Sequence, residues 1–309
     1  MIYTCTLNPA IDLFVATDDL LPNTVNRTSQ EDYQANGKGV NVSIILKRLG
    51  VDSTALGFIA GFTGKYIEDE LHKMGIQTDF IEIDGITRVN MFVRTKDDEY
   101  KIVNRGPFVE DFYRNEMLKK IESLPDECTL FVSGSVPRGI EDEIYFEIAK
   151  IAQAKNIELI LDISSKVLLD CLEYQPFLIK PNREELAHIY DKTELSDDEV
   201  IELGYDLLRK GAQRALISLG SKGAIYIDKS QVVKVNSPKG KVINTACSGD
   251  TMLAMFVQKI KTGNTVEQAL IYASAAGSST AFSVGLSDLK DVEELKKQIN
   301  SKILKGGKK

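Results

Sequence analysis

The stretch NTACSGDTMLAMF, residues 244–256, changes abruptly from polar to apolar character. Its first half, NTACSGD, has the composition of a turn, and apolar residues at helical spacing follow at once. We therefore predict a helix over residues 250–261, with Asp250 in its first turn. The first turn of a helix leaves backbone N–H groups without partners, and the helix dipole favours negative charge there. The stretch thus predicts an anion-binding helix end that also carries a carboxylate.

Short apolar runs alternate with helical patterns along the rest of the chain. The runs that read as buried strands are residues 1–6, 53–60, 129–134, 157–164, 177–182 and 214–220. The helical patterns between them cover residues 38–50, 64–75, 142–156, 183–190 and 197–211. Strands that alternate with helices predict an α/β fold with a mostly parallel sheet covered on both faces. Further helices are predicted over 266–282 and 288–300, and the tail 305–309 is expected to be disordered.

Two segments, at about 12–35 and 88–104, depart from this alternation. Both show strand-like patterning without an intervening helix, so we predict a small antiparallel sheet beside the main one. Such a sheet could act as a lid, and an apolar face on it would pair with a second copy of the chain. Because no low-complexity linker separates these segments from the rest, we predict one domain over 1–309. The apolar face and unpaired edges of the lid predict a homodimer formed through it.

Composition excludes several classes of function. The chain has 309 residues, is 43% apolar and 27% charged, and carries a net charge of -7, so no general attraction to nucleic acid or anionic membranes is expected. It has no apolar run of the ~20 residues that a membrane span needs, and its start does not read as a signal peptide. The four scattered cysteines fit a reducing cytoplasm. His72 and His188 lie in charged helical stretches and are expected to face solvent, so catalysis must rest on carboxylates, lysines and backbone groups.

Polar clusters follow most of the predicted strands. Ligands of α/β sheets bind at the carboxyl ends of the strands, so these clusters should gather at one edge of the sheet. They read LNPAID (7–12), NGKGVN (36–41), SGSVPRG (133–139), KPNREE (180–185), SLGSKG (218–223) and TACSGD (245–250). A single glycine-rich turn at a strand end is ordinary turn chemistry, but six clusters on one edge predict a ligand site.

These clusters, in this order, resemble the PfkB (ribokinase-like) family of sugar kinases over nearly the whole chain. NGKGVNV is similar to the first signature of the family, usually GGKGxN, and NTACSGD to the second, usually [DN]TxGAGD. KPNREE is similar to the NxxE motif of the family. The stretches TCTLNPAID, VNRT, ALGFIAGFTGKYIEDEL and TDFIEIDGITRVN further resemble 1-phosphofructokinases and tagatose-6-phosphate kinases, the first more closely. The resemblance implies a three-layer α/β/α fold with a small β-sheet lid, and a kinase that uses ATP and Mg²⁺.

Three residues depart from the signatures. Asn36 stands where the family usually has glycine, and asparagine tolerates left-handed backbone conformations. Cys247 stands at the first glycine of the second signature, and Ser248 stands where alanine is usual. A helix N-terminus favours a thiolate, so we expect Cys247 to be more reactive than the other cysteines. A thiolate there would also repel the incoming phosphate, so the working form is expected to be the neutral thiol.

The resemblance assigns the transfer chemistry to the end of the helix at 244–256. The amides of residues 246–250 would hold the γ-phosphate, which gathers charge on its oxygens during transfer. Asp250 would take the proton from the attacking sugar hydroxyl. An N-cap role for Asp250 is compatible with this assignment. The predicted catalytic group is Cys247, Ser248, Gly249 and Asp250.

The nucleotide and metal assignments follow from the other motifs. Glu185 lies one helical turn from Asn182, and the pair could hold Mg²⁺ through water, because Mg²⁺ keeps most of its waters. Glycines in SLGSKG would let the backbone approach the nucleotide phosphates, and small residues in SAAGSS would leave room for adenine. The predicted nucleotide-binding residues are Lys180, Asn182, Ser218, Gly220, Ser221, Gly223, Gly249, Ala275 and Ser279.

The sugar end should combine hydroxyl-binding groups with cations. Asp12 and Asn41 would bind hydroxyls, and Lys38 and Arg88 would bind the sugar phosphate. Gly37 and Ser135 complete the predicted sugar site, together with Arg27, Arg105 and Arg138. For these three arginines a solvated surface charge is the alternative interpretation. Arg27 sits in the lid and could reach the site of a neighbouring subunit.

Two other classes of function were weighed against a kinase. A dinucleotide-dependent oxidoreductase would need GxGxxG directly after the first strand, where this chain has LNPAID. A non-catalytic sugar- or nucleotide-binding regulator on the kinase fold stays open because of the departures at Asn36 and Cys247. We predict phosphorylation of a ketose phosphate, foremost fructose 1-phosphate to fructose 1,6-bisphosphate, with tagatose 6-phosphate as the alternative substrate.

Overall fold

The predicted parallel strands assemble into one large sheet. The computed structural model of the chain describes residues 1–304, so the tail 305–309 lies outside the described residues. From the centre outwards, the parallel strands are β1 (Ile2–Thr6), β9 (Thr129–Ser133), β10 (Glu158–Asp162), β11 (Leu178–Ile179) and β12 (Arg214–Ser218) on one side, and β4 (Thr54–Ala60), β5 (Gln77–Thr78) and β6 (Ile81–Ile83) on the other. Beyond β12 the sheet continues antiparallel through β13 (Ala224–Asp228), β14 (Val232–Val235) and β15 (Ser301–Leu304).

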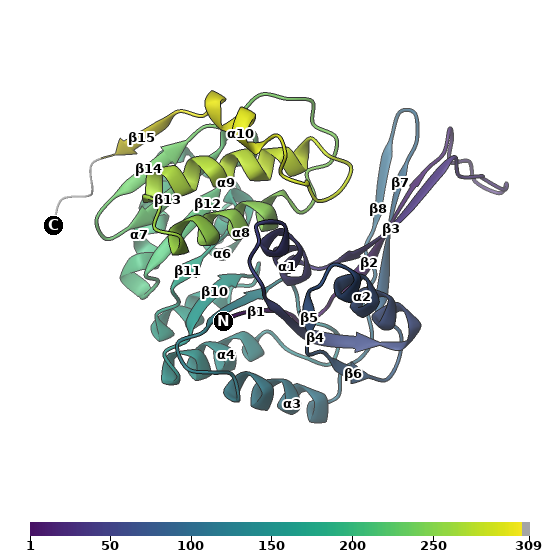
Figure 1. Cartoon of the computed structure of the whole chain (residues 1–309), viewed down its shortest axis with the longest axis horizontal. Helices are drawn as coiled ribbons and strands as arrows, with labels where there is room; N and C mark the ends of the chain where they lie inside the picture. The colour runs from purple at the N-terminus through teal and green to yellow at the C-terminus, as the bar shows by residue number, and fades with distance from the viewer. Residues whose placement is uncertain (305–309) are drawn as a thin grey trace.

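Helices cover both faces of this sheet, as the continuous apolar runs predict (Figure 1). Strand β9 demonstrates the arrangement, because Leu130 and Val132 belong to the core on one face and Phe131 to the core on the other. One face carries α1 (Lys38–Arg48), α8 (Ser248–Lys261), α9 (Val266–Ala281) and α10 (Val292–Leu295). The opposite face carries α3 (Asp111–Glu122), α4 (Glu143–Ala154), α5 (Leu168–Cys171) with η1 (Leu172–Tyr174), α6 (Arg183–Ile189) and α7 (Asp197–Lys210). The predicted three-layer α/β/α fold is confirmed.

A separate four-stranded sheet projects from the main body (Figure 1). We call it the small sheet, and its order is β3 (Gln30–Asn36), β2 (Ala10–Ala16), β7 (Arg88–Arg94) and β8 (Glu99–Ile102). Its root packs against α1 and α2 (Gly61–Lys73) through a cluster that includes Ile11, Ala35 and Ile67. The prediction of a purely antiparallel sheet is wrong for one pairing, because β2 and β7 run parallel. The chain passes from the main sheet into both β2 and β7, so both strands point away from the main body and run parallel.

The predicted helix over 288–300 is also wrong in extent. The chain forms only the single turn α10 and the short η3 (Lys296–Gln298) before it becomes β15. Leu289 has a φ of 64°, in the left-handed region, so a continuous helix cannot pass through it. Val292, Leu295 and Ile299 are buried in the core, which explains the helix-like spacing of their apolar side chains.

The histidines and cysteines lie largely as expected. His72 and His188 are exposed on α2 and α6. All four cysteines are free, and Cys247 alone among them is not fully buried. Within residues 1–304, no helix combines the length and the apolar character that a membrane crossing requires.

Candidate active site

A cavity of about 830 Å³ opens where the carboxyl ends of the parallel strands meet α1, α6 and α8. It is the place where the predicted motifs converge. The predicted residues that line it are Asp12, Lys38, Asn41, Lys180, Asn182, Glu185, Ser218, Gly220, Ser221, Gly223, Cys247, Ser248, Gly249 and Asp250. Residues from five of the six predicted clusters thus share one cavity, as expected for parallel strands that end at the same sheet edge. The sixth cluster, SGSVPRG (133–139), does not line it.

Helix α8 begins at this cavity. Cys247 occupies the N-cap with φ 62° and ψ 0°, and Ser248, Gly249 and Asp250 form the first turn. The first N–H group with a helical acceptor is that of Thr251, which donates to the Cys247 carbonyl at 3.0 Å. The N–H of Ala246 donates instead to Asn244 Oδ1 at 2.9 Å, so Ala246 does not contribute to the predicted anion site. The site is formed by the first turn of α8 itself.

Asp250 is buried at this helix end, with 5% of its surface exposed. Its Oδ2 accepts a hydrogen bond of 2.8 Å from Asn41 Nδ2 on α1. Burial and the nearby negative charge of Asp162 raise the pKa of Asp250 to about 6, although Lys38, Asn41 and Lys180 favour its ionised form. A carboxylate whose pKa lies near neutrality suits the removal and return of a proton.

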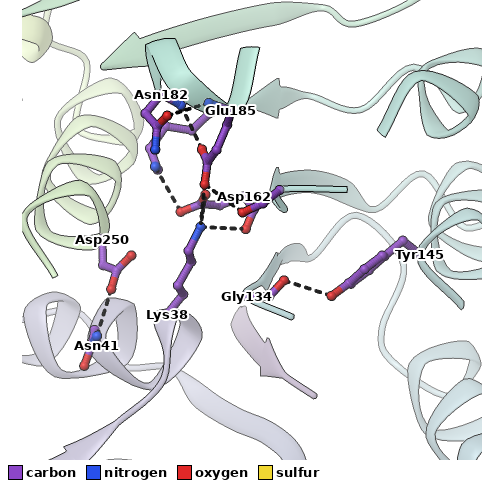
Figure 2. Close-up of polar contacts among 10 residues, drawn as sticks. Lys38, Asn41, Gly134, Tyr145, Asp162, Asn182, Glu185 and Asp250 are labelled. Carbon is purple, nitrogen blue, oxygen red and sulfur yellow. Dashed lines mark hydrogen bonds and ion pairs between the residues drawn. The ribbon is translucent and has the colours of Figure 1, made fainter. Parts of the chain in front are cut away.

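Two lysines converge on Asp162, which terminates strand β10 and is 1% exposed. Lys38 Nζ lies 2.9 Å from Oδ1 of Asp162, and Lys180 Nζ lies 3.1 Å from its Oδ2. Figure 2 shows Lys38 reaching between Asp162 and Glu185, whose Oε1 is 3.4 Å from the same ammonium group. Burial alone would raise the pKa of Asp162, but Lys180 and Lys38 outweigh it and the pKa is lowered.

Asp162 was not among the predicted site residues. The available signal was an acidic residue at the end of an otherwise apolar strand, LILD, immediately before a polar turn. Such a residue also fits a strand terminus without a role in the site. Only the tertiary structure brings Lys38 and Lys180 to it, from segments 124 and 18 positions away in sequence.

Asp12 enters the cavity from strand β2 of the small sheet and is 4% exposed. Its two oxygens are held separately, Oδ2 by Asn36 Nδ2 at 2.6 Å and Oδ1 by Asn90 Nδ2 at 2.8 Å. Burial raises the pKa of Asp12, and the hydrogen bond from Asn90 opposes this effect. Asn36 and Asn90 were not predicted as binding residues, because their contact with Asp12 depends on the register of three strands.

The predicted magnesium pair, Asn182 and Glu185, forms the capping box of α6. Glu185 Oε2 accepts from the backbone N–H of Asn182 at 2.8 Å, and Oε1 accepts from Ser164 Oγ at 2.7 Å. Within residues 1–304, no group of three or more acidic, histidine or cysteine side chains could enclose a metal ion. One carboxylate at a cavity edge fits an ion that keeps its waters and is held mainly by substrate phosphates, which is the usual Mg²⁺ arrangement.

At the predicted nucleotide end of the cavity, the α9 residues that line it are not the ones that the sequence predicted. Gly220 and Gly223, with φ 58° and 95°, shape the turn after β12, and a Cβ on Gly223 would lie 2.0 Å from the Val235 carbonyl oxygen. The α9 side chains that line the cavity are Ser274, Gly277, Ser278 and Ala281. Ala275 and Ser279, predicted for this role, instead turn into the protein interior, where they are 0% and 1% exposed. The difference is one position along α9, which rotates a side chain by about 100°.

Most of the predicted sugar-phosphate residues border the small sheet and do not line the cavity. The Arg88 guanidinium donates to the carbonyls of Asn8 and Asn104 at 2.8 and 3.1 Å. Arg138 donates to the Gly106 carbonyl at 3.1 Å, and Arg105 and Arg27 are exposed, Arg27 between β2 and β3. Ser135 lines a separate hollow with Tyr145, whose hydroxyl donates to the Gly134 carbonyl (Figure 2). Gly37 has φ 137°, and a Cβ there would lie 2.7 Å from Thr6.

The expected reactive thiolate at Cys247 is contradicted. Burial, followed by the charge of Asp250, raises the pKa of Cys247 far above its ordinary value. Among the described residues, Asn36 and Asn41 oppose this rise, and Asn36 Nδ2 lies 3.5 Å from the sulfur atom. Desolvation and a neighbouring carboxylate therefore outweigh the helix dipole and favour the neutral thiol, which is the form expected of the working enzyme.

Comparison with known proteins agrees with this site. The sequence matches the description "pfkB family carbohydrate kinase" over residues 5–292. The chain belongs to the PfkB carbohydrate kinase family. It is 54% identical to the D-tagatose-1-phosphate kinase of Bacillus licheniformis over 97% of this chain and 98% of that one. It is 36% identical to the 1-phosphofructokinase of Bacillus subtilis over 96% and 97%.

The fold of this PfkB kinase also matches solved structures. The crystal structure of phosphofructokinase-2 from Escherichia coli in complex with potassium superposes with a TM-score of 0.89, at 25% identity, over 96% of this chain and 98% of that one. The protein is therefore a sugar-phosphate kinase, that is, an enzyme that transfers a phosphate group to an alcohol. The family uses ATP as its phosphate donor.

Proposed function

We propose that this enzyme transfers the γ-phosphate of ATP to the 6-hydroxyl of a ketohexose 1-phosphate, with Asp250 as the general base. The observation that carries the proposal is a buried carboxylate with a pKa of about 6 at the N-terminus of α8, in the cavity that also holds Lys38 and Lys180. Relatives named for D-tagatose 1-phosphate and for fructose 1-phosphate support a ketose carrying its phosphate on carbon 1.

The chemistry follows from the side chains at the helix end. Asp250 accepts the proton of the 6-hydroxyl as that oxygen forms a bond to the γ-phosphorus, while the bond from phosphorus to the ADP oxygen breaks. The N–H of Ser248 donates to the Thr245 carbonyl at 3.4 Å, so the N–H groups of Gly249 and Asp250 are the ones that would face the charge developing on the γ-phosphate oxygens. Lys180 stands beside this turn, because a Cβ on Gly249 would lie 3.1 Å from Lys180 Nζ. A side chain at position 249 would therefore separate the lysine from the helix end.

We expect Mg²⁺ to be held mainly by the phosphates of ATP and less by the protein. A Mg²⁺ ion bound with ATP would neutralise part of the phosphate charge. Glu185 and Asn182 are the residues that would meet its waters, since they line the cavity at the end of α6. Glu185 is also paired with Lys38, so the lysine offsets the negative charge of Glu185 and Asp162 before the substrates arrive.

The sugar would lie against the small sheet. Asp12, fixed by two asparagines, would accept hydrogen bonds from sugar hydroxyls. Arg88 would bind the 1-phosphate after a shift of its guanidinium, whose Nε is buried without a hydrogen-bond partner among the described residues. D-Tagatose and D-fructose differ only in the orientation of the hydroxyl on carbon 4. The greater identity to the D-tagatose-1-phosphate kinase leads us to place D-tagatose 1-phosphate ahead of fructose 1-phosphate.

The test is a substrate panel with MgATP that reads kcat/KM. The panel contains the 1-phosphates and 6-phosphates of D-tagatose and D-fructose, together with the two free sugars. We expect both 1-phosphates to exceed both 6-phosphates and the free sugars, with D-tagatose 1-phosphate highest. Preference for a 6-phosphate would overturn the assignment to ketose 1-phosphates, and absence of turnover with every sugar would favour the non-catalytic regulator.

We also propose that two copies of the chain associate through their small sheets. Strand β8 is exposed along its whole length, and Tyr100 and Ile102 on it are 41% and 52% exposed. Phe14 and Phe92 stack at a ring distance of 4.8 Å on a sheet that has no helix layer at its outer end. Apolar strands with unpaired edges favour association. Sedimentation at micromolar concentration should give a dimer, and Phe14→Asp should give a monomer. A monomeric wild-type enzyme that is fully active would contradict the proposal.

A further inference from the structure

Asn36 joins two of the carboxylates that line the cavity, Asp12 and Asp250, although neither Asn36 nor its role was expected from the family signature. Its Nδ2 donates to Asp12 Oδ2 at 2.6 Å, and its Oδ1 accepts from Asn41 Nδ2 at 2.9 Å. The same Asn41 Nδ2 donates to Asp250 Oδ2 at 2.8 Å. A continuous chain of hydrogen bonds therefore runs from Asp12 on the small sheet, through two amides, to Asp250 at the end of α8.

The orientation of both amides is determined by their partners. Asn41 is 1% exposed, and its Oδ1 has no hydrogen-bond partner among the described residues. A reversed Asn41 would point this oxygen at two acceptors, Asn36 Oδ1 and Asp250 Oδ2, which is unfavourable for buried groups. Asn36 is fixed in turn, because its Oδ1 also accepts from the Gly37 backbone N–H at 2.5 Å. The amide of Asn36 thus holds the amide of Asn41 in the orientation that donates to Asp250.

Two of the three residues that depart from the family signatures, Asn36 and Cys247, contact one another at this point. Asn36 Nδ2 lies 3.5 Å from the sulfur of Cys247, the N-cap of α8. A glycine at position 36 would have no side chain to bond Asp12 or Asn41. The chain from Asp12 to Asn41 is therefore a feature of this protein's own residue at position 36, and the glycine usual in the family cannot make it.

We propose that Asn36 is a positioning residue that couples the sugar-binding carboxylate to the base. By fixing Asp12 and Asn41 together, it keeps Asp250 ionised and oriented when a sugar is held by Asp12. The proposal rests on the roles proposed above for Asp12 and Asp250. Other charged groups that face Asp250 are Asp162, Lys38 and Lys180, from the ends of β10, α1 and β11, and the thiol of Cys247 lies beside it. Among the described hydrogen bonds, Asn36 contacts Cys247 and does not contact Asp162, Lys38 or Lys180.

Asn90 supplies a matched control for the experiment. Like Asn36, it donates one hydrogen bond to Asp12, at 2.8 Å, but it makes no contact with Asn41 or Asp250 among the described hydrogen bonds. The variants are Asn36→Ala and Asn90→Ala, with Asn36→Gly as a second truncation that carries the usual family residue. Kinetics are measured with whichever sugar phosphate the wild-type enzyme uses best.

Both alanine variants should raise KM for the sugar phosphate and leave KM for ATP nearly unchanged. Asn36→Ala and Asn36→Gly should in addition lower kcat by roughly tenfold or more, the worth of one hydrogen bond to a charged group. The fall in kcat with Asn90→Ala should be smaller. If Asn36→Ala and Asn90→Ala lose kcat to the same extent, Asn36 serves Asp12 alone and the proposed coupling is wrong.

A second readout does not depend on turnover or on the identity of the sugar. The carboxyl carbon of Asp250 is followed by ¹³C NMR between pH 4 and pH 8, with the signal assigned by its loss in Asp250→Asn. Loss of the oriented Asn41 donor should raise the pKa of Asp250 in Asn36→Ala and Asn36→Gly, and Asn90→Ala should match the wild type. An unchanged titration in both Asn36 variants would overturn the proposal, even if the substrate panel had failed to identify a sugar.

Discussion

The two sheets of this kinase differ in how they are packed. In the large sheet, strand β9 is buried on both faces, and Leu130, Phe131 and Val132 are each 0% exposed. In the small sheet, every residue of β8 is exposed, and the hydrophobic cluster at its root is reached from β2, β3 and β7 by Ile11, Ala35 and Val89. The large sheet therefore supplies most of the stability, and the small sheet is held mainly by its base.

The candidate active site lies where these two regions meet. Asp250, Lys180 and Asp162 belong to the large sheet and the helices on it, and Asp12 belongs to the small sheet. Charge stabilisation requires groups that are already in place, which a doubly covered sheet provides. Binding and release of a sugar require a surface that can move, which a weakly packed sheet provides. We therefore propose that the transfer step takes place on the first region and that the second region captures the sugar.

The largest effect is expected from Asp250→Asn. The variant should bind ATP and sugar phosphate nearly normally and lose ~10²–10⁴ in kcat, the usual contribution of a positioned general base. Steady-state kinetics in which each substrate is varied in turn measure kcat, the KM for ATP and the KM for the sugar phosphate. Retention of a tenth or more of the wild-type kcat would show that Asp250 is only a helix-capping residue.

The packing difference predicts unequal losses of stability. Phe131→Ala removes a fully buried ring between two layers and should lower the free energy of unfolding by about 3–5 kcal/mol. Phe14→Ala removes a half-buried ring whose main aromatic partner is Phe92, and should cost about 1 kcal/mol. Urea unfolding of the two variants, at a protein concentration where the association state is known, compares them. Equal losses would mean that the small sheet is as firmly packed as the large one.

The charge at the transfer site should itself oppose folding. The pKa of Asp250 rises from 3.8 to about 6 in the folded protein, so the folded state binds more protons than the unfolded state between these values. Its contribution to stability is thus lost as pH rises through this window. Asp250→Asn should therefore have a higher Tm than the wild type at pH 7.5, and the difference should shrink towards pH 4. If Asp250→Asn has a lower Tm than the wild type at pH 7.5, the ionised Asp250 stabilises the fold and this prediction is wrong.

The smallest effect is expected at Cys247. Its φ of 62° suits glycine, so Cys247→Gly should raise the Tm slightly and change kcat by less than about threefold. Cys247→Ala keeps the Cβ in the same backbone conformation and serves as the control. Because the thiol is neutral, alkylation at pH 7 should be slow compared with a small-molecule thiol. Rapid alkylation, found by mass spectrometry, would mean that the helix dipole dominates after all.

The sequence was sufficient for the parts of the fold that depend on local pattern. Apolar runs such as residues 129–134 and 157–164 predicted strands buried on both faces, and five of the six clusters at the strand ends reached one cavity. Asp162 could not be singled out, because an acidic residue at a strand end gains its meaning only when two distant lysines arrive. The contacts of Asp12 with Asn36 and Asn90 depend on strand register, and one step along α9 decided between Ala275 and Ser274.

The position of a side-chain charge was harder to predict for the long arginine side chains. Arg88, Arg105 and Arg138 stand in or near motifs, yet their guanidiniums or backbone groups are tied to loops around the small sheet. A long side chain can reach any of several partners, so its position in the sequence does not determine where its charge lies. For these arginines the role in phosphate binding stays a prediction.

Hydrogen exchange tests the contrast between the two sheets most directly. The amides of β2, β3, β7 and β8 are compared with those of β9, β10 and β12, with and without saturating sugar phosphate and in the absence of ATP. We expect the small sheet to exchange faster in the free enzyme and to gain most of the protection when the sugar phosphate binds, while the large sheet changes little. Equal exchange in the two sheets, or protection confined to the large one, would contradict the account.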